Sequence, residues 1–535
     1  MFLASVLVLI TLMDMFGPYA WFDRLTILSG VEGVEADADV NSKFQRTGWN
    51  SHAKQRFMHP PIFHFTPLEN AVVYRCRLWE QSDANNSYQV ESGTSDVKLA
   101  AIWERLPSVG NFEVTAEALD ASRNVMGKMS FQFSKIAPFE GPAFAKPARL
   151  RVVRYDGPAT AGEVRPYRDG KGSYLESGFK AALWRLRNQS DMKATQFPAL
   201  FKSAYIRILT TYARINPGGE KAQEAIKLAK KFGESLIGES TPSDWAYGNM
   251  PMSHQPGCLQ IGRAGMVGLA YLDLYAATQD ESFLKAAMRI ADTLKKTQLD
   301  DGRWYFRVDP QTGKMLEDYT SDQVESILLL DELIRSHKRK DLVETRDKAV
   351  RWMLANPCKT FHWQQQWDDV KTLAPYENLE WFDTGLFIEY LLRCVTPENG
   401  YAKIALDLLY YIDDQFIEWE PSGEYITPGA REQYVCYHII DWHTAHYIRV
   451  CVAFHRRTGD QTYLRKACAM ADTLTVIQHP DGFYPTWMKH KPARDNPRQL
   501  RDINYSDTWA NCSSYTGEIL MKLGEYLKEM DSWKK

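Results

Sequence analysis

Two stretches of this chain repeat each other at a fixed distance, and this self-similarity limits what the chain can fold into. The segment from Thr278 to Gly302 recurs as Thr458 to Gly482, an ungapped offset of 180 residues (458 − 278). Both copies contain the run Ala-Asp-Thr-Leu and both end on Asp-Gly. Repetition at fixed spacing is typical of folds built from copies of one unit, here predicted as three helix pairs of about 60 residues per offset.

The second half of the chain is predicted to be helical throughout. Apolar residues recur there at three- and four-residue spacing, which is typical of helices. Mostly apolar segments, which we interpret as inner helices, begin near Phe197, Ile261, Tyr319, Leu379, His438 and Asp507. Amphipathic segments, which we interpret as outer helices, begin near Glu176, Glu220, Ser282, Leu342, Tyr401 and Thr462. Six of each kind is the number needed to close a double ring.

The first part of the chain has a different period. Short β-branched and aromatic runs, with turn residues every eight to twelve positions, predict an antiparallel β-sandwich over residues 58–137. The run from Trp103 to Ala121, WERLPSVGNFEVTAEALDA, resembles a fibronectin type III-like module. A Pro/Gly-rich link over 138–166 then leads to a helical domain predicted at 170–532. The predicted fold class is therefore mainly α, with a small β-sandwich in front.

Composition excludes some classes of protein. A net charge of −3 and a pI near 6.5 argue against a nucleic-acid partner held by phosphate contacts. The eight cysteines are scattered, without a CxxC pair or zinc-type spacing. The 16 Trp, 27 Tyr and 24 Phe suit either a large core or surfaces on which sugar rings stack.

The first twenty residues form an apolar segment that resembles the core of a signal peptide, too short for a stable membrane span. The segment favours a periplasmic or extracellular location. Against this, no Lys or Arg precedes it and Asp14 interrupts it. A misplaced start codon is the alternative, and the protein would then be cytoplasmic.

The helical part resembles the six-hairpin glycosidase superfamily, whose fold is an (α/α)6 toroid. The resemblance covers about residues 175–530 and is carried by TGDQTYLRKACAMADTL, beginning at Thr458, and by the turns DGRWYFR and DGFYPTW. It implies a toroid whose inner-helix entrances meet at one end. The superfamily includes unsaturated uronyl hydrolases and other glycosidases, and related toroids include polysaccharide lyases and a uronyl epimerase.

Polar chemistry is densest between Gly429 and Tyr447, GAREQYVCYHIIDWHTAHY. A buried helix is predicted to begin at Asp441, with Glu432 on the loop in front of it. Uncompensated burial of such groups costs about 1–3 kcal/mol each, and more for charges, so the density favours a function. Apolar crowding can raise the pKa of a carboxyl group, as a glycosidic general acid requires.

The predicted site gathers residues from the loops that enter the inner helices. Candidate catalytic residues are Glu432, Asp441, Glu377, Asp244, Tyr434 and His443. Candidate substrate-binding residues are Trp245, His254, Tyr319, Asn378, Trp381, Arg431, Tyr437, Trp509 and Asn511. An acid before a helix can also be a plain N-cap, which is an open alternative for Asp322, Asp383 and Asp507. Arg431 suits either an ion pair with its neighbour or a clamp for a substrate carboxylate.

No metal or cofactor is predicted, because His443 and His446 alone make a weak ligand set. The first functional hypothesis is a glycoside hydrolase with two carboxyl groups acting on an oligo- or polysaccharide, including one that contains uronic acid. The alternatives are a lyase or uronyl epimerase with a Tyr or His base, and a sugar-binding protein without catalysis. A monomer or a weak homo-oligomer is expected.

Overall fold

The structure is a computed structural model that describes residues 43–48, 54–137, 139, 173–253, 257–319, 321–364, 373–419, 424–492 and 500–532. The signal-like segment at 1–20, the link at 140–166 and the candidate residue His254 lie outside these residues. Among the described helices, none combines the length and the apolar character that crossing a membrane requires.

The N-terminal part is a β-sandwich, as predicted. Its larger sheet has the order β2-β8-β7-β4-β5 and its smaller sheet the order β1-β3-β6. The strands are β1 (Arg46–Thr47), β2 (Arg56–Phe57), β3 (Ile62–Phe65), β4 (Val73–Glu80), β5 (Asp83–Ser92), β6 (Asp96–Lys98), β7 (Gly110–Leu119) and β8 (Val125–Lys135), with a short helix α2 (Ala100–Trp103). Two of these strands precede residue 58. The fibronectin type III-like relationship stays a prediction.

Aromatic side chains fill the space between the two sheets. Phe63 of the smaller sheet lies 4.9 Å from Phe131 and 5.7 Å from Phe133 of the larger sheet, measured between ring centroids. Along β4, burial alternates, with Tyr74, Cys76 and Leu78 facing inward. The period-two pattern in the sequence therefore reflects one buried and one exposed face.

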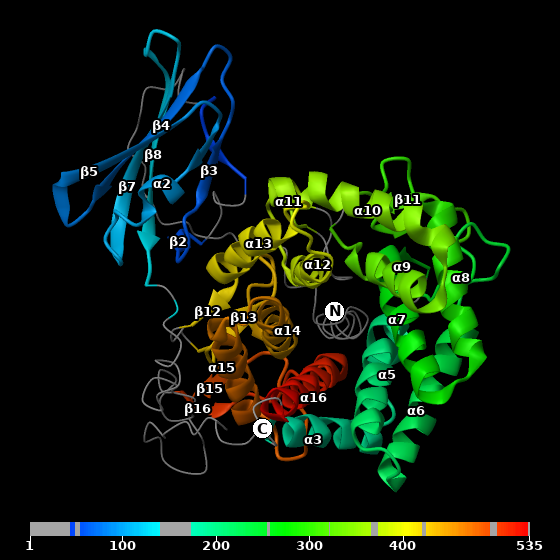
Figure 1. Cartoon of the computed structure of the whole chain (residues 1–535). Coiled ribbons are helices and arrows are strands. Elements are labelled where there is room, and N and C mark those ends of the chain that lie inside the picture. The colour runs from blue at the N-terminus through cyan, green and yellow to red at the C-terminus, as the bar shows by residue number, and fades with distance from the viewer. Residues whose placement is uncertain are drawn as a thin grey trace, which may run out of the picture.

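The C-terminal part is a closed (α/α)6 toroid, which confirms the predicted fold class (Figure 1). The inner helices are α5 (Pro198–Ile215), α7 (Ile261–Thr278), α9 (Val324–His337), α12 (Phe382–Arg393), α14 (Asp441–Thr458) and α16 (Ala510–Ser532). Each packs against the next, and α16 packs against α5 to close the circle. The outer helices are α3 (Ser173–Arg187), α6 (Glu220–Gly238), α8 (Glu281–Thr297), α10 (Val343–Ala355), α13 (Tyr401–Gln415) and α15 (Gln461–Ile477).

Short strands and short helices lie in the loops of the toroid. Three small antiparallel sheets are formed by β9 (Leu259–Gln260), β10 (Arg307–Val308) and β11 (Met315–Glu317), by β12 (Ile417–Glu418), β13 (Gly429–Arg431) and β14 (Ile439–Ile440), and by β15 (His490–Pro492) and β16 (Leu500–Ile503). Short helices are α4 (Lys193–Gln196), η3 (Lys340–Leu342) and α11 (Pro357–Thr360). The first two of these sheets each join a loop to the start of an inner helix.

The repeated segments correspond to the outer helices α8 and α15 with the turns at both of their ends, and these helices belong to helix pairs on opposite sides of the toroid. In each copy a glutamine at the same position of the repeat, Gln298 or Gln478, stabilises the turn after the outer helix by hydrogen bonds. Gln298 Nε2 donates to the carbonyl oxygens of Gly302 (2.8 Å) and Thr345 (2.7 Å), and Gln478 Nε2 donates to those of Gly482 (2.7 Å) and Ser177 (2.9 Å). The repeated residues therefore stabilise the packing of the outer helices and are not candidate catalytic residues.

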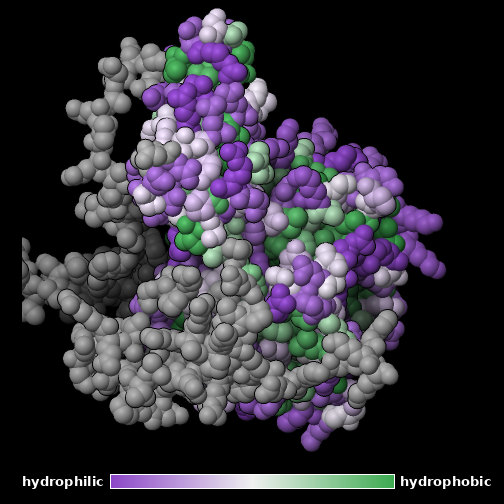
Figure 2. Space-filling view, turned by 60° about the vertical axis from the view of Figure 1, so that its left-hand side comes forward, coloured by the Kyte–Doolittle hydropathy of each residue, from purple (hydrophilic) through white to green (hydrophobic). Residues whose placement is uncertain are grey.

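The sandwich is attached to the outer helix α13. The Met58 N–H donates to Asp414 Oδ1 at 2.6 Å, and His59 Nε2 lies 3.2 Å from Asp413 Oδ2. Lys54 Nζ donates to Glu418 Oε1 at 3.2 Å. In the face shown in Figure 2, hydrophilic residues cover most of the described surface of the sandwich and apolar ones are scattered. The two domains are therefore joined by a small polar junction beside β12.

Candidate active site

Four acidic side chains lie buried inside the toroid, where α9 and α12 begin. They are Asp322, Glu325, Glu380 and Asp383, and each is at most 4% exposed. We call this group the carboxyl cluster. Charged carboxylates are costly to bury, so four of them in one place require either partners or protonation.

Local structure explains how Glu380 and Asp322 are held. Ser321 Oγ donates to Glu380 Oε1 at 2.8 Å, and the Asp383 N–H donates to Glu380 Oε2 at 3.3 Å. Glu380 therefore caps the first turn of α12, where the helix dipole favours a negative charge. Asp322 accepts a hydrogen bond from Gln260 Nε2.

Asp383 is different, because its carboxyl group caps nothing. Neither of its side-chain oxygens has a hydrogen-bond partner among the described residues, although the residue is only 1% exposed. Burial raises the pKa of Asp383 well above its usual value, and the nearby Asp322, Glu380 and Glu325 raise it further. Burial and the neighbouring acids therefore favour the protonated form of the Asp383 carboxyl group.

The cluster has one basic member, Arg263 of α7, which is 1% exposed. Its charge lowers the pKa of Asp383 and of Glu325, but burial outweighs it and raises the pKa of Glu325 to about 8. Burial also raises the pKa of Glu380 to about 7, against hydrogen bonds that favour its charged form. Buried acids with strongly shifted pKa values are typical of functional sites, so this cluster is a candidate active site.

Glycines let α7 approach α9 closely enough to bring Arg263 into the cluster. A Cβ atom on Gly262 would lie 2.1 Å from Asp322 Oδ1, and one on Gly265 would lie 2.3 Å from the Ser326 nitrogen. These contacts explain why an apolar helix contains glycine despite its low helix propensity.

Of the predicted catalytic residues, Asp441 lies in the first turn of α14 and is fully buried. Burial raises the pKa of Asp441 well above its usual value, although Thr516 Oγ1 donates to its Oδ2 at 3.1 Å. Glu432 is half-buried, and both acids lie near the thiol of Cys512, whose pKa burial and their charges raise. The helix start at Asp441 is therefore confirmed, and the catalytic roles of Glu432 and Asp441 stay predictions.

The candidate base His443 is fully buried, and its ring centroid lies 5.3 Å from that of Trp381. Burial lowers the pKa of His443 to about 3, which keeps the imidazole neutral. Its neighbour His446 is bound on both sides, by Tyr515 Oη at Nδ1 (3.0 Å) and by the Phe382 carbonyl oxygen at Nε2 (2.9 Å). His446 therefore fixes the geometry of α12 and α16.

Several candidates are tied to the junction between loops. Arg431 donates to Glu418 Oε1 (3.0 Å) and to the Tyr437 carbonyl oxygen (2.6 Å). Arg431 therefore forms an ion pair, as one of the two predicted roles requires, and its partner in this pair is Glu418. The hydroxyl groups of Tyr434 and Tyr437 both donate to Gln415. Three hydrogen bonds join the loop before α12 to the loop before α14. Asn378 Nδ2 donates to Gln433, and Trp381 Nε1 donates to the Arg431 carbonyl oxygen. The Tyr434 N–H donates to the Leu379 carbonyl oxygen.

The remaining candidates differ in burial. Asp244 and Glu377 are exposed, and Trp245 is half-buried. Tyr319 stacks on His362, with centroids 4.4 Å apart. Lys193 Nζ sits 3.7 Å from the Trp509 ring centroid, and Asn511 is buried, with no partner for its Oδ1 among the described residues.

Sequence reasoning did not select Arg263, Glu325 or Glu380 as site residues, and it left Asp322 and Asp383 open between a role in the site and a plain N-cap. A signal was present for Arg263, which is a lone charge in the apolar run LQIGRAGMVGLAY. For Asp383 the N-cap reading fails, because Glu380 does the capping. Within the described part of the chain, no group of three or more His, Cys, Asp or Glu residues is arranged to hold a metal ion.

Comparison with solved structures finds the same architecture. A D-mannose isomerase aligns with a TM-score of 0.50 at 14% identity, over 68% of this chain and 100% of its own. An α-mannanase of glycoside hydrolase family 76 from Bacteroides thetaiotaomicron aligns over 68% and 98% (13% identity, TM-score 0.47), and an unsaturated glucuronyl hydrolase specific for heparin over 67% and 99% (11% identity, TM-score 0.46). No family model matches the chain, and no curated protein matches it. The likeness to the D-mannose isomerase concerns the fold alone.

Proposed function

We propose that this protein is a carbohydrate-active enzyme that cleaves glycosidic bonds by carboxyl acid–base catalysis. The observation that carries the proposal is Asp383, a buried acid without a hydrogen-bond partner among the described residues, next to three other carboxyl groups. The fold supports a saccharide as substrate, since the D-mannose isomerase with the same architecture acts on a sugar.

In the proposed reaction, Asp383 donates its proton to the glycosidic oxygen as the bond to the anomeric carbon breaks. A carboxylate of the cluster, which we assign to Asp322, removes a proton from the water that forms the new bond. Gln260 holds the Asp322 carboxylate in place. The raised pKa of Asp383 supports the donor role, because a general acid must carry its proton at the working pH.

A second candidate is a sugar epimerase, isomerase or lyase, which moves a proton to and from carbon. The fold shared with a D-mannose isomerase favours it. His443 is the candidate proton acceptor, but burial lowers its pKa to about 3 and so weakens it as a base. No contact among the described residues specifically favours the third candidate function, a sugar-binding protein without catalysis.

One panel of oligo- and polysaccharides separates these candidates. New reducing ends indicate hydrolysis, an ultraviolet-absorbing unsaturated product indicates a lyase, and a new sugar isomer without cleavage indicates an epimerase or isomerase. Binding without turnover leaves the sugar-binding protein.

The Asp383→Asn variant then tests the site. On a confirmed substrate, kcat should fall by about two to four orders of magnitude, since proton transfer contributes that much. The matched control is Asp244→Asn, an exposed aspartate of an entrance loop. Normal turnover in Asp383→Asn with a large loss in Asp244→Asn would move the site to the rim and disprove the role of Asp383.

A further inference from the structure

A cavity of about 640 Å³ lies inside the toroid toward the C-terminal ends of the inner helices. Its walls come from α5, α12, α14 and α16, whereas the carboxyl cluster lies where α9 and α12 begin. This volume falls within the roughly 300–1,000 Å³ typical of small-molecule sites. The cavity is therefore separate from the site proposed above.

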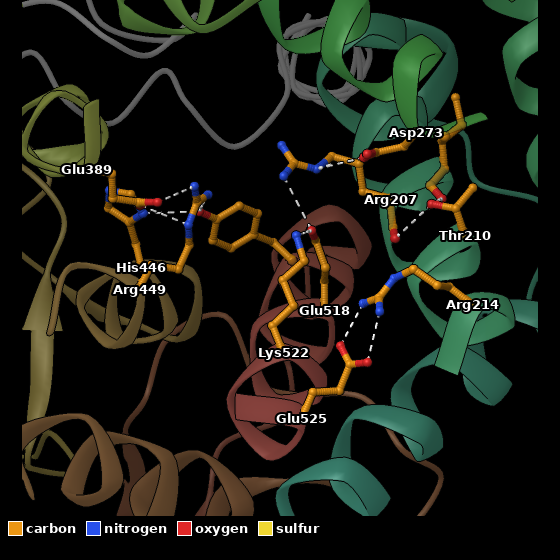
Figure 3. Close-up of polar contacts among 12 residues, drawn as sticks. Arg207, Thr210, Arg214, Asp273, Glu389, His446, Arg449, Glu518, Lys522 and Glu525 are labelled. Atoms are coloured by element: carbon orange, nitrogen blue, oxygen red, sulfur yellow. Dashed lines mark hydrogen bonds and ion pairs between the residues drawn. The ribbon is translucent and has the colours of Figure 1, made fainter. Parts of the chain in front are cut away.

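Basic side chains outnumber acidic ones in the lining. They are Arg214, Arg393, Arg449, Arg456, Arg457 and Lys522, against the acids Glu389, Glu525 and Glu529. Four of the six are neutralised by carboxylates. Figure 3 shows three of these pairs, Arg214–Glu525, Arg449–Glu389 and Lys522–Glu518, and the fourth is Arg393–Asp331 at 2.8 Å.

Arg456 and Arg457 are the exceptions. Neither has an ion-pair partner among the described residues, and both are exposed in the last turn of α14. Arg456 is held in place by Tyr526, because its guanidinium carbon lies 4.6 Å from the centroid of the Tyr526 ring and its side chain hydrogen-bonds to that residue. That ring is fixed in turn, since Tyr526 Oη binds His455 Nδ1 at 2.6 Å.

A cation in the last turn of a helix also stabilises the helix dipole, by about 0.3–1 kcal/mol. In α5 and α12 this need is met by Arg214 and Arg393, each of which has a carboxylate partner as well. The dipole therefore explains a cation at the end of α14, but it does not explain two guanidinium groups that line one cavity without a carboxylate partner among the described residues.

We propose that this cavity binds a small organic oxyanion, a phosphate monoester or a carboxylate, through Arg456 and Arg457. Guanidinium groups recognise such oxyanions with paired, charge-assisted hydrogen bonds. The lining also includes the apolar residues Ile448 and Val452 of α14 and Ile519 and Leu523 of α16, which suit the uncharged body of the ligand. The proposal does not depend on the reaction at the carboxyl cluster.

Isothermal titration calorimetry on the full chain tests it, with glucose 6-phosphate, glucuronate, inorganic phosphate and glucose as probes. We expect saturable binding of glucose 6-phosphate, glucuronate or both, weaker binding of inorganic phosphate, and none of glucose. Which of the two organic anions binds more tightly distinguishes the phosphate monoester from the carboxylate. Absence of saturable binding by both, or equal binding of glucose, would refute the proposal.

The Arg456→Gln/Arg457→Gln variant should weaken that binding by about tenfold or more, the usual loss for charged hydrogen bonds. The control is Arg465→Gln/Lys285→Gln, which removes the same charge from exposed positions on the outer helices α15 and α8. An equal loss of affinity in the control variant would show that the net charge of the protein alone determines binding, and it would refute the proposed site. If the double variant does not fold, Arg457→Gln is used, and unchanged affinity in it would count against the proposal.

Discussion

The indole nitrogen of Trp381 donates a hydrogen bond of 2.7 Å to the carbonyl oxygen of Arg431. This bond ties the start of α12, where Glu380 and Asp383 of the carboxyl cluster lie, to β13, which belongs to the densest polar stretch of the sequence. Trp381 is fully buried and also packs against His443 and His446. The polar stretch from Gly429 to Tyr447 therefore contacts Trp381 and helps to hold the start of α12 in place.

Replacing Trp381 by Phe should remove this bond and leave a buried carbonyl oxygen without its donor. We expect the free energy of unfolding to fall by about 1–3 kcal/mol, the usual cost of such a loss. Urea denaturation measures the change. Trp184→Phe is the control, since Trp184 is half-buried and should cost less than 1 kcal/mol. Equal effects in the two variants would contradict the role of the bond.

The Gly265→Ala substitution should separate α7 from α9. The new methyl group would lie 2.3 Å from the Ser326 nitrogen and 2.4 Å from the Glu325 carbonyl carbon, which are backbone atoms that cannot move aside cheaply. We expect a loss of about 1–3 kcal/mol in urea denaturation. At Gly238 of α6 nothing lies within 4 Å of such a methyl group, so Gly238→Ala should be neutral or stabilising. A tolerated Gly265→Ala would show that the helices can shift.

The Asp413→Asn substitution should weaken the junction with the sandwich. Asp413 Oδ2 accepts from Lys466 Nζ at 2.6 Å and lies 3.2 Å from His59 Nε2, and both Asp413 and Lys466 are buried. An uncompensated buried charge typically costs about 3–5 kcal/mol, which we expect by chemical denaturation. Asp407 of the same helix pairs with Lys403 but is 43% exposed, so Asp407→Asn should change stability by less than about 0.5 kcal/mol.

Stability should fall as the pH rises from about 6.5 to 8. Burial raises the pKa of Glu325 to about 8 and that of Asp414 to about 7, so the native state keeps protons that the unfolded state has lost. The free energy of unfolding then decreases with pH, by at most about 1.4 kcal/mol per pH unit and group. Below 6.5 the buried, neutral His443 acts in the opposite direction, because its pKa is lowered to about 3.

Thermal or urea unfolding across this pH range measures the slope. Glu325→Gln should flatten it, because the amide does not titrate. Glu344→Gln, at a side chain that is 79% exposed, should leave the slope unchanged. A wild-type slope that is flat or rising between pH 6.5 and 8 would show that these acids are not buried as described.

Much of the fold could be read from local patterns. The predicted inner helix at Ile261 starts at that residue, and the polar stretch leads into α14 at Asp441 as expected. Helix periodicity, caps such as Asp280 and Asp460, and the turn glycines Gly302 and Gly482 act over a few residues, so the sequence displays them directly. Their recurrence at 180 residues predicts the closed double ring.

The candidate site was predicted only in outline. The sequence places polar residues at the entrances of the inner helices, but it does not show which ones turn inward. Asp383 and Asp244 both lie at such entrances, yet one is buried and the other is exposed. The difference depends on which groups of other helices surround each side chain, and these contacts join residues far apart in the chain.

By itself, the sequence determined the period of each segment, and through it the β-sandwich, the twelve helices and the order in which they close. The tertiary structure decided which carboxyl groups share one enclosure and which are paired. Arg263, Asp322 and Asp383 come from three different helix entrances, and only the closure of the toroid brings them together. Burial and mutual charge then set their protonation, and neither quantity exists until the helices have packed.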